Sequence, residues 1–447
     1  MTSPVETGIA NLADALREQL PAGMVATEPS AITALVRPWN AQVTARPSVV
    51  ARCRTTADVQ AVVRAARSAD VPLSVLGGGH DWAGSAIRDG GLLVDLSGMR
   101  QVTVDGAEAR VAGGATVSDV LDAARPHGYA AAVGQVSSAG FAGLTLGGGY
   151  GPLMGLVGLG VDNVLSAEVV LADGRVVTAD PDHEPDLFWA LRGGGGNFGV
   201  VTQLRTRLHP FATVTSGRFA FGWDQARSVL RGWRDLTASA DDALDLGLAA
   251  MSTPAGLVLA TAPTWAGDPA QAAEQFARVR ALGEPMLDNV DRQALADTVH
   301  ASDVAFPHGR NYYQGTRILP GLTDDAIDDF VRSAEAMPAT CALTAHYAHG
   351  AATRVPVAET AYAYRDEHLV ANIIGAWTDG DGAAESAWVR DTERRLDAHA
   401  LPGGWVNLMA HGDPRAQDAY GTNTPRLLAV KAHYDPDGVF SATPLPQ

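Results

Sequence analysis

The placement of glycine constrains this chain more than any other feature of its sequence. The 447 residues include 48 glycines, and the densest group lies in residues 134–160. Each glycine inside a helix costs about 1 kcal/mol relative to alanine, so we do not expect this segment to be helical. Its small residues, among them Ser137, Ser138 and Ala139, would let the backbone lie close against a large flat molecule. Because long ordered loops are usually functional, the segment is predicted to be a compact ligand-binding loop.

The composition narrows the class of protein. Apolar residues make up 46% of the chain and charged residues 19%, which is typical of a protein with a large folded core. The net charge of −17 argues against nucleic-acid binding, because phosphates are bound by clustered lysine and arginine. No stretch reaches the roughly 18 apolar residues that a membrane helix needs. We therefore expect no nucleic-acid partner and no membrane span.

Rare residue types restrict the chemistry. Lys431 is the single lysine, and no phosphate-loop sequence surrounds it. Cys53 and Cys341 lie far apart without CxxC spacing, so they form neither a disulfide framework nor, alone, a zinc site. The N-terminus has no basic segment followed by an apolar core, as a secretory signal would have. These features together predict a cytoplasmic protein.

The chain divides into three parts. Up to residue 209, short apolar strands alternate with capped helices and glycine runs, which is an α/β pattern. From residue 210 the glycine clusters disappear, and longer helical patterns alternate with strands. Near residue 403 glycine and aromatic residues return, in a tail predicted to hold a helix and strands. We thus predict one domain over 1–209, a second over 210–402, and a segment 403–447 that returns to the first.

A strand followed by GGGH is a candidate anion site. Residues 72–76 have the pattern of a buried strand, which runs directly into Gly77, Gly78, Gly79 and His80. Successive glycines let backbone N–H groups converge on an anion such as a diphosphate, with His80 at the mouth of that nest. A tight structural turn with an ordinary polar histidine explains the same residues equally well.

Three sequence motifs that would indicate other functions are either absent or surrounded by residues that do not fit them. Gly194, Gly196 and Gly199 match GxGxxG, but a β-branched strand follows them where a dinucleotide site needs a helix. His346 and His349 are spaced HxxH, but residues three apart in a strand point to opposite faces, so no metal site is expected. No GxSxG sequence is present, which disfavours serine hydrolysis.

Four segments in a fixed order carry a family resemblance. They are RPSVVARCRTTADVQAVVRAARSADVPLSVLGGGHDWAG, GFAGLTLGGGYG, PDLFWALRGGGGNFGVVT and YGTNTPRLLAVKAHYDPDGVF, and they extend over essentially the whole chain. Together they resemble the berberine-bridge-enzyme-like branch of the vanillyl-alcohol-oxidase superfamily, whose members have a PCMH-type FAD-binding domain. The resemblance implies an α+β fold, with a two-part FAD-binding domain and a substrate domain whose antiparallel sheet is covered by helices. It also implies an FAD-dependent oxidoreductase.

The family pattern assigns the cofactor residues. It implies that the loop 76–80 holds the FAD diphosphate and that His80 bonds covalently to the C8 methyl group of the flavin ring. Asn407 and Asn423 match positions near the flavin, and the region of Gly199 would contact the adenosine side. The residues that the resemblance assigns to FAD are Leu76, Gly77, Gly78, Gly79, His80, Asp81, Gly84, Val136, Ser137, Gly140, Gly143, Thr145, Gly148, Gly149, Gly199, Val200, Asn407 and Asn423.

One departure from the family pattern changes the implied link to FAD. Most close relatives carry a second covalent link through a cysteine, in a segment like GxCxxVGVAGLTLGGG. This chain has GQVSSAGFAGLTLGGG, with Val136 at the cysteine position. Because valine forms no thioether, the resemblance implies FAD bonded through His80 alone, as in the minority of relatives that includes bacterial 6-hydroxy-D-nicotine oxidase. A milder oxidant or a more closed active site is expected.

A second departure concerns the base. Many relatives place a proton-accepting tyrosine in a YxN motif, but this chain has Trp405 two residues before Asn407, and tryptophan accepts no proton. Tyr150, in GGGYG, matches another tyrosine that relatives use near the substrate, and it is the predicted catalytic residue. A phenol with a pKa of about 10 needs activation to act as a base, whereas oxidation of a neutral amine needs no strong base.

The resemblance also bears on the oxidant and the substrate. The position that gates the flavin in relatives is Ala139 here, small enough to admit oxygen, which favours an oxidase over a dehydrogenase. The predicted substrate-side residues are Trp405, Tyr347, His346 and Tyr364, although a one-residue slip would exchange the two faces of the strand that holds His346. Their aromatic character suggests an aromatic or apolar alcohol, amine or biosynthetic intermediate, with molecular oxygen reduced to hydrogen peroxide. The alternatives are an oxygenating or cyclising biosynthetic flavoenzyme and a flavin-retaining protein without turnover.

Overall fold

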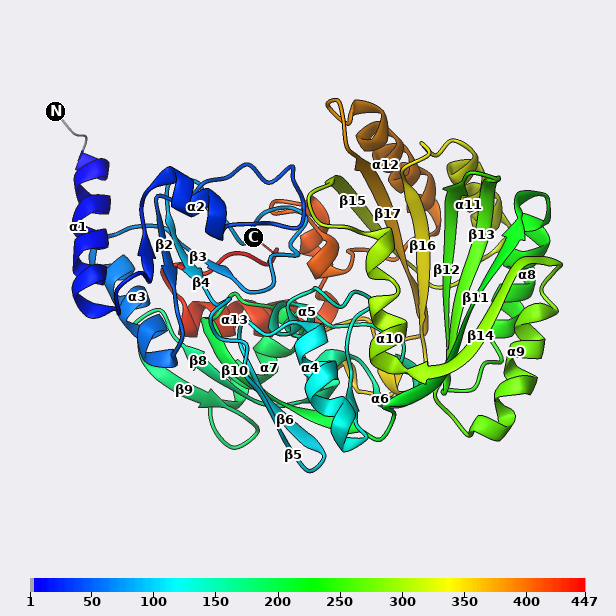
Figure 1. The fold of residues 1–447 in the computed structure, drawn as a ribbon, viewed down its shortest axis with the longest axis horizontal. Coiled ribbons are helices and arrows are strands. Elements are labelled where there is room, and N and C mark those ends of the chain that lie inside the picture. The colour runs from blue at the N-terminus through cyan, green and yellow to red at the C-terminus, as the bar shows by residue number, and fades with distance from the viewer. Residues whose placement is uncertain (1–3, 447) are drawn as a thin grey trace.

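The computed structural model describes residues 4–446, which form three β-sheets with flanking helices (Figure 1). The first sheet has the order β1 (Val25–Ala26), β2 (Val49–Arg52), β4 (Leu92–Asp95) and β3 (Leu73–Leu76), with β2, β4 and β3 parallel. The second has the order β5 (Val102–Asp105), β6 (Glu108–Ala112), β10 (Val200–His209), β8 (Val164–Val170) and β9 (Val176–Ala179), and β7 (Ala130–Ala131) pairs with β10. The third is antiparallel, in the order β14 (Pro285–Ala294), β11 (Thr213–Gly222), β13 (Gly256–Trp265), β12 (Leu244–Thr253), β16 (Ala342–Ala348), β17 (His368–Trp377) and β15 (Asn311–Leu319). The predicted α+β class with an antiparallel sheet is confirmed.

Amphipathic helices build the first part of the chain. The helix α3 (Thr56–Ser68) begins at Thr55, whose side chain accepts a hydrogen bond from the Asp58 N–H. It buries Val59, Val62 and Val63, together with the leucines of α1 (Pro4–Gln19), in the core of the first sheet. The helices α2 (Pro29–Leu35), α4 (Val117–Ala124) and α7 (Pro185–Gly194) complete this part. Outside the glycine-rich segment 134–160, short strands and capped helices alternate here as predicted.

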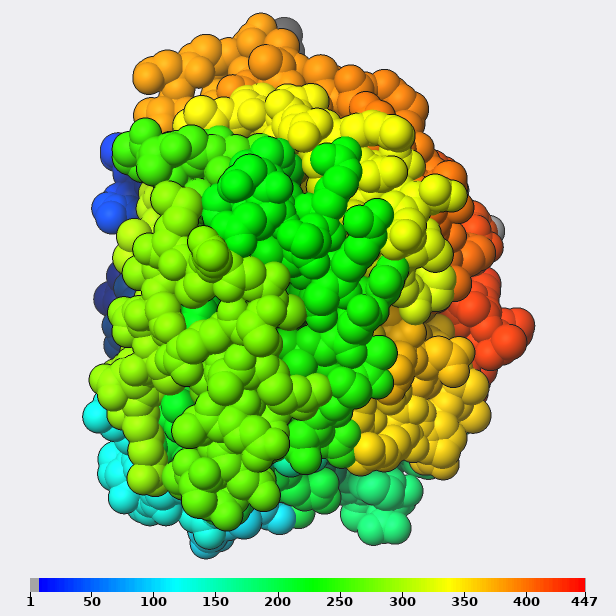
Figure 2. All heavy atoms as spheres, turned by 90° about the vertical axis from the view of Figure 1, so that its right-hand side faces the viewer, coloured from blue at the N-terminus to red at the C-terminus, as the bar shows by residue number. Residues whose placement is uncertain are grey.

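The third sheet is covered by helices on its outer face. Leu244, Leu246 and Leu248 of β12 alternate along the strand and pack into one apolar core with these helices. The covering helices are α8 (Ala226–Thr237), α9 (Ala272–Arg280), α11 (Asp324–Glu335) and α12 (Ala383–Leu396). Figure 2 views this side, where green to yellow atoms of α8, α9 and α11 cover the sheet beneath orange atoms of α12. The opposite face of the sheet is turned toward the first part of the chain, with α10 (Leu295–His300) beside it (Figure 1).

The C-terminal tail packs against the first part of the chain. Helix α13 (Thr424–Tyr434) contacts α7, where Leu427 lies against Gly194. Lys431, the single lysine, donates hydrogen bonds to the Asn197 carbonyl and to the Asp435 carboxylate. It therefore has a structural role in attaching this tail to the first part of the chain. The prediction of strands in this tail was wrong, because residues 403–446 contain short 3-10 turns and one helix.

The glycine-rich segment departs from its predicted loop conformation. It contains two short helices, α5 (Phe141–Leu146) and α6 (Met154–Val157), so the expectation of no helix was wrong there. Phe141 and Leu146 are fully buried in the main core. Burying one such side chain gains about 1.5–3 kcal/mol, which outweighs the cost of the glycine within α5. None of the helices in residues 4–446 is long and apolar enough to cross a membrane.

Candidate active site

The two glycine-rich loops that the sequence marks separately lie against each other. A Cβ on Gly78 would lie 2.2 Å from the backbone nitrogen of Gly140, and a Cβ on Gly140 would lie 2.5 Å from that of Gly78. No side chain fits between backbones this close, so both positions require glycine. Gly79 has a φ of +72°, which lets the loop turn sharply after β3, whose last residue is the buried Leu76. The loop 76–80 and the segment that begins at Gly134 thus form one continuous surface.

His80 lies on that surface among aromatic rings. Its Nε2 shares a hydrogen bond of 2.7 Å with the Ser138 hydroxyl. The Trp39 ring stacks on it at 5.1 Å, and the His308 ring meets it edge-on at 5.0 Å. Burial, followed by the nearby His308, lowers the pKa of His80 to about 3. His80 is therefore a neutral imidazole at physiological pH, and the hydrogen bond between its Nε2 and Ser138 fixes the orientation of the ring.

The residues after His80 hold the shape of the loop. The Asp81 carboxylate accepts hydrogen bonds from the backbone N–H groups of Ala83 and Ala86, at 3.2 and 2.9 Å. Gly84 has a φ of +77°, and a Cβ there would lie 2.9 Å from Val43. Asp81 and Gly84 thus help to fix the conformation of the loop backbone. Gly77 lies at the start of the loop, and a Cβ there would lie 3.6 Å from the Gly113 carbonyl oxygen.

Val136 is half-buried, and no described cysteine is near it. Cys53 is buried in the core of the first sheet, and Cys341 is buried behind the third sheet. The adjacent Ser137 binds the Asp303 carboxylate through both its backbone N–H and its hydroxyl. The Ser137 side chain therefore joins the glycine-rich segment to the chain segment that precedes β15.

The floor of the surface is formed by the remaining glycines. Gly148 and Gly149 have φ values of +134° and +77°, and a Cβ on Gly148 would lie 2.4 Å from the Trp405 ring. Asn407 donates from Nδ2 to the carbonyls of Gly143 and Leu144, at 3.3 and 3.0 Å. Trp405 and Asn407 thus come from the C-terminal tail to contact the glycine-rich segment.

Tyr150 stands where this floor meets the third sheet. Its hydroxyl accepts a 2.7 Å hydrogen bond from Nδ2 of Asn372 on β17, and its ring lies 4.9 Å from Trp405 and 5.0 Å from His346. Burial raises the pKa of Tyr150 to about 12 and lowers that of His346 to about 4. Gln135 donates to Nδ1 of His346 at 3.4 Å. The site therefore contains a protonated phenol and a neutral imidazole.

The structure decides which strand face meets the glycine loops. On β16, His346 is turned toward Tyr150, whereas Tyr347 packs into the core under the outer helices and donates to Glu367 at 2.6 Å. The expectation that Tyr347 lies beside His346 at the substrate is thus wrong, because adjacent strand residues point to opposite faces. Tyr364 lies on the correct side but donates its hydroxyl to the Pro402 carbonyl.

Three residues assigned to FAD contact other parts of the protein itself. Asn423 donates from Nδ2 to the carbonyls of Val357 and Thr360, so it holds that loop and bonds to neither glycine loop. Gly199 packs closely on β8, where a Cβ would lie 2.5 Å from Val169. Val200 is completely buried beneath the first sheet.

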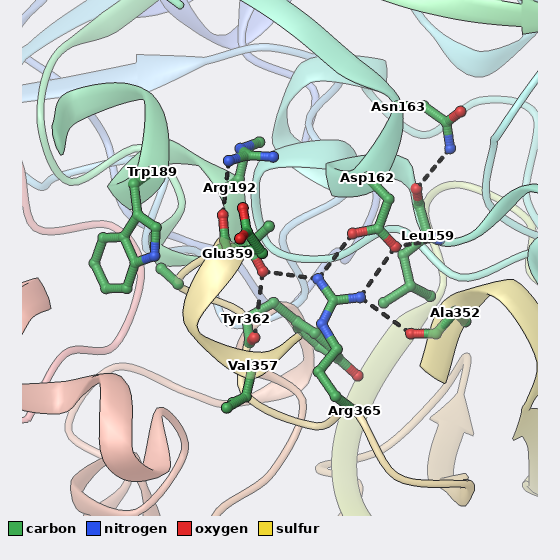
Figure 3. A network of polar contacts seen from close by, with 12 residues as sticks. Leu159, Asp162, Asn163, Trp189, Arg192, Ala352, Val357, Glu359, Tyr362 and Arg365 are labelled. Atoms are coloured by element: carbon green, nitrogen blue, oxygen red, sulfur yellow. Dashed lines mark hydrogen bonds and ion pairs between the residues drawn. The ribbon is translucent and has the colours of Figure 1, made fainter. Parts of the chain in front are cut away.

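A buried polar network fastens this loop to the glycine-rich segment (Figure 3). Arg365 donates to both Asp162 oxygens, at 3.0 and 2.8 Å, and also to the Ala352 carbonyl and the Thr360 hydroxyl. The Arg365 guanidinium lies 4.9 Å over the Tyr362 ring, which in turn packs 5.0 Å from Trp405. The network thus connects Trp405, through Tyr362 and Arg365, to Asp162 in the first part of the chain.

Several residues of the site were not predicted from the sequence. Asn372 could have been noticed as the one amide in the otherwise apolar strand HLVANIIGAW. Trp39 and His308 gave no signal, because each reaches the site only through tertiary contacts from a distant segment. Gln135 lies within the glycine-rich segment, but only the tertiary structure places it against His346.

Unsatisfied polar atoms test whether a ligand such as FAD fits here. The side-chain oxygens Thr145 Oγ1, Asn372 Oδ1 and Thr316 Oγ1 are buried without a hydrogen-bond partner in the described structure. Gly143 lies beside open space, since a Cβ there would meet no atom within 4 Å. Orphaned acceptors and donors around a glycine floor fit a large polar cofactor. Within residues 4–446, by contrast, no group of three or more side chains could hold a metal ion.

Comparison with known proteins identifies the family of this chain. Residues 47–180 match the model of an FAD binding domain, and residues 403–444 match the model described as berberine and berberine like. The FAD-linked oxidoreductase aurO of Gibberella zeae is 30% identical over 415 residues, which cover 90% of this chain and 81% of that protein. The (R)-6-hydroxynicotine oxidase of Paenarthrobacter nicotinovorans is 38% identical over 218 residues, which cover 48% of this chain and 47% of that protein.

The fold leads to the same family. The crystal structure of 6-hydroxy-D-nicotine oxidase from Arthrobacter nicotinovorans superposes with a TM-score of 0.87 at 25% identity, covering 96% of this chain and 98% of that one. The full-length similarity, the two family models and the paired glycine loops agree with one another. The chain therefore belongs to the berberine-bridge-enzyme-like family of FAD-linked oxidoreductases.

Proposed function

We propose that this protein is an oxidase that carries FAD on a single covalent bond to His80 and oxidises a small amine or alcohol. The observation that carries the proposal is the juxtaposition of Tyr150, His346 and Asn372 with the glycine surface that holds His80. FAD, when bound, would accept hydride from the substrate and pass the electrons to oxygen, giving hydrogen peroxide. The similarity to (R)-6-hydroxynicotine oxidase and to 6-hydroxy-D-nicotine oxidase supports this choice.

The residues of the chain have separable tasks in this proposal. Backbone N–H groups of residues 77–79 and 140 would bind the diphosphate. His80 supplies a neutral ring nitrogen, and because Ser138 engages Nε2, the bond to the flavin forms at Nδ1. Val136 leaves the second linking position without a thiol.

Tyr150 orients the substrate rather than removing its proton. Because Asn372 donates to the phenol oxygen, the phenol hydrogen is free to point toward a substrate nitrogen or oxygen. A pKa raised to about 12 by burial keeps that hydrogen in place at neutral pH. The arrangement therefore suits a substrate that releases hydride without prior deprotonation by a strong base, such as a neutral amine. The small Ala139 would leave oxygen a path.

Three measurements on the purified holoenzyme test the proposal. After acid precipitation the yellow colour should remain with the protein, and flavin washing free would contradict the covalent bond. Anaerobic addition of amines, alcohols and sugars should bleach the flavin with at least one class. Air should then give one hydrogen peroxide per substrate oxidised. Labelled oxygen in the product without peroxide would instead establish an oxygenating enzyme, and a flavin that no substrate bleaches would indicate a retaining protein without turnover.

A further inference from the structure

A patch of small residues lies on the inner face of the third sheet beside His346. Because Leu244, Leu246 and Leu248 point into the core under the outer helices, Asp245 and Gly247 point to the opposite face. Gly247 confirms this orientation, since a Cβ there would lie 3.4 Å from Cε1 of His346. This face is the one that meets Tyr150.

The patch is open to solvent although its strands are central in the sheet. Gly247 pairs with Ala262 on β13, and Ala249 pairs with Ala260. Ala262 is exposed and Ala249 and Ala260 are half-buried, while the leucines behind them are buried. We call these four residues, 247, 249, 260 and 262, the alanine floor. Gly247 is itself buried under the His346 ring, so the accessible part of the alanine floor is formed by its three alanines beside that ring.

Asp245 borders the alanine floor as a buried acid without a partner. It is 4% exposed, it makes no hydrogen bond with the described residues, and its Oδ1 is completely buried. Burial alone raises its pKa to about 7, with no cation near enough to lower it. The two other fully buried acids differ, because Asp95 binds Ser97 and Asp435 binds Lys431. An unpaired buried carboxyl is costly, so its position beside the alanine floor points to a partner supplied by a ligand.

We propose that Asp245 is the counter-ion of a cationic nitrogen in the substrate, and that the substrate is a flat, apolar amine lying on the alanine floor. The assignment rests on the proposed function: the cationic nitrogen, which does not react, would lie at Asp245, and the carbon that loses hydride, at the other end of the molecule, would face Tyr150. Asp245 lies two residues along β12 from Gly247, roughly 7 Å at the usual strand rise, and Gly247 lies against His346, whose ring is 5.0 Å from that of Tyr150. A cation both pairs the carboxylate and is favoured by the net charge of −17.

Binding measurements with a matched pair of probes test this assignment. Benzylamine is cationic at pH 7.5 and benzyl alcohol is its neutral counterpart, and isothermal titration of the holoenzyme gives the Kd of each. The wild type should bind benzylamine at least tenfold more tightly than benzyl alcohol. Asp245→Asn should abolish that preference by weakening the amine tenfold or more while leaving the alcohol within twofold. Asp325→Asn, which removes the same charge from an exposed position on α11, should leave both Kd values unchanged.

Equal Kd values in the wild type, or a preference that survives in Asp245→Asn, would overturn the assignment. If Asp245→Asn yields no folded holoenzyme, Asp245→Ser removes the charge with a smaller side chain and serves as the same test. The titrations are done without oxygen on holoenzyme whose flavin has been reduced beforehand, so that binding is read without turnover and failure of the oxidase proposal is distinguishable. Selective amine binding with a flavin that no substrate bleaches would reject the oxidase and keep Asp245, whereas bleaching by alcohols with no amine preference would do the reverse.

Discussion

Arg365 and Asp162 form a bidentate ion pair in which both side chains are more than nine-tenths buried. The pair joins the loop before β17 to the glycine-rich segment, and the Arg365 guanidinium stacks on Tyr362 (Figure 3). Because Tyr362 packs against Trp405, the pair also supports the wall of the active site.

Breaking this pair from one side should destabilise the protein strongly. Asp162→Asn leaves the guanidinium buried without its charge partner, which costs about 3–5 kcal/mol. Thermal and urea unfolding should therefore shift markedly, and the near-ultraviolet signal of Trp405 should change. Asp242→Asn, which breaks the exposed pair with Arg354, is the matched control and should have little effect. Equal shifts for the two variants would contradict the role assigned to burial.

Gly143→Ala separates cofactor binding from protein stability. The position lies inside α5 beside open space, so alanine should stabilise the protein without FAD by up to about 1 kcal/mol. If FAD fills that space, the same methyl group should weaken FAD retention severalfold. Unfolding without FAD and the ratio of flavin to protein after purification measure the two effects. Undiminished FAD retention would place the cofactor elsewhere.

His80→Ala and Ser138→Ala should differ in their effect on covalent linkage. His80→Ala removes the bonding nitrogen, so all flavin should dissociate in acid. Ser138→Ala removes only the hydrogen bond that holds Nε2, so linkage should form more slowly while its final extent approaches that of the wild type. The fraction of protein-bound flavin over time, measured after acid precipitation, checks both. Unchanged kinetics in Ser138→Ala would argue against a positioning role for Ser138.

The pH dependence of flavin reduction should identify which group titrates. Tyr150, with a pKa raised to about 12 by burial, and His346, with a pKa lowered to about 4 by burial, keep one charge state between pH 5 and pH 10. Tyr150→Phe should therefore lower the anaerobic reduction rate by about 10–100-fold without moving any inflection in its pH profile, as expected for a lost orienting hydrogen bond. An inflection that disappears in Tyr150→Phe would show that the phenol acts as the base after all.

Asp245 should make stability fall as pH rises. Burial raises its folded pKa to about 7, above its unfolded value, so the folded state holds the proton more tightly. The wild type should lose stability relative to Asp245→Asn by about 1.4 kcal/mol for each pH unit between the unfolded and folded pKa values, and no further above pH 7. Urea unfolding of the two proteins from pH 4 to pH 9 measures the difference. A difference independent of pH would show that folding does not shift the pKa of Asp245.

Local residue patterns were sufficient for many elements of the fold. The capped helices expected before residue 209 include α3, whose cap at Thr55 and apolar stripe of Val59, Val62 and Val63 act within a few turns of chain. The absence of helix predicted for residues 134–160 failed, because the burial of Phe141 and Leu146 overrides the local cost of glycine. The face of β16 was equally beyond local pattern, since both His346 and Tyr347 belong to an alternating strand.

The sequence by itself determined which positions allow close backbone contact and which side chain could bond a flavin. It placed glycine at positions 78 and 140, valine at 136 and histidine at 80, and these identities fix where backbones can touch and where a flavin could be bonded. Only the tertiary structure decided which of them meet: that Gly78 lies on Gly140, that Tyr150 binds Asn372 of the third sheet, and that Asp245 borders the alanine floor unpaired. The physical reason is that the backbone conformations and bonds open to a residue depend on its own type. Which residues lie close together, and which are buried, depends instead on how distant segments pack.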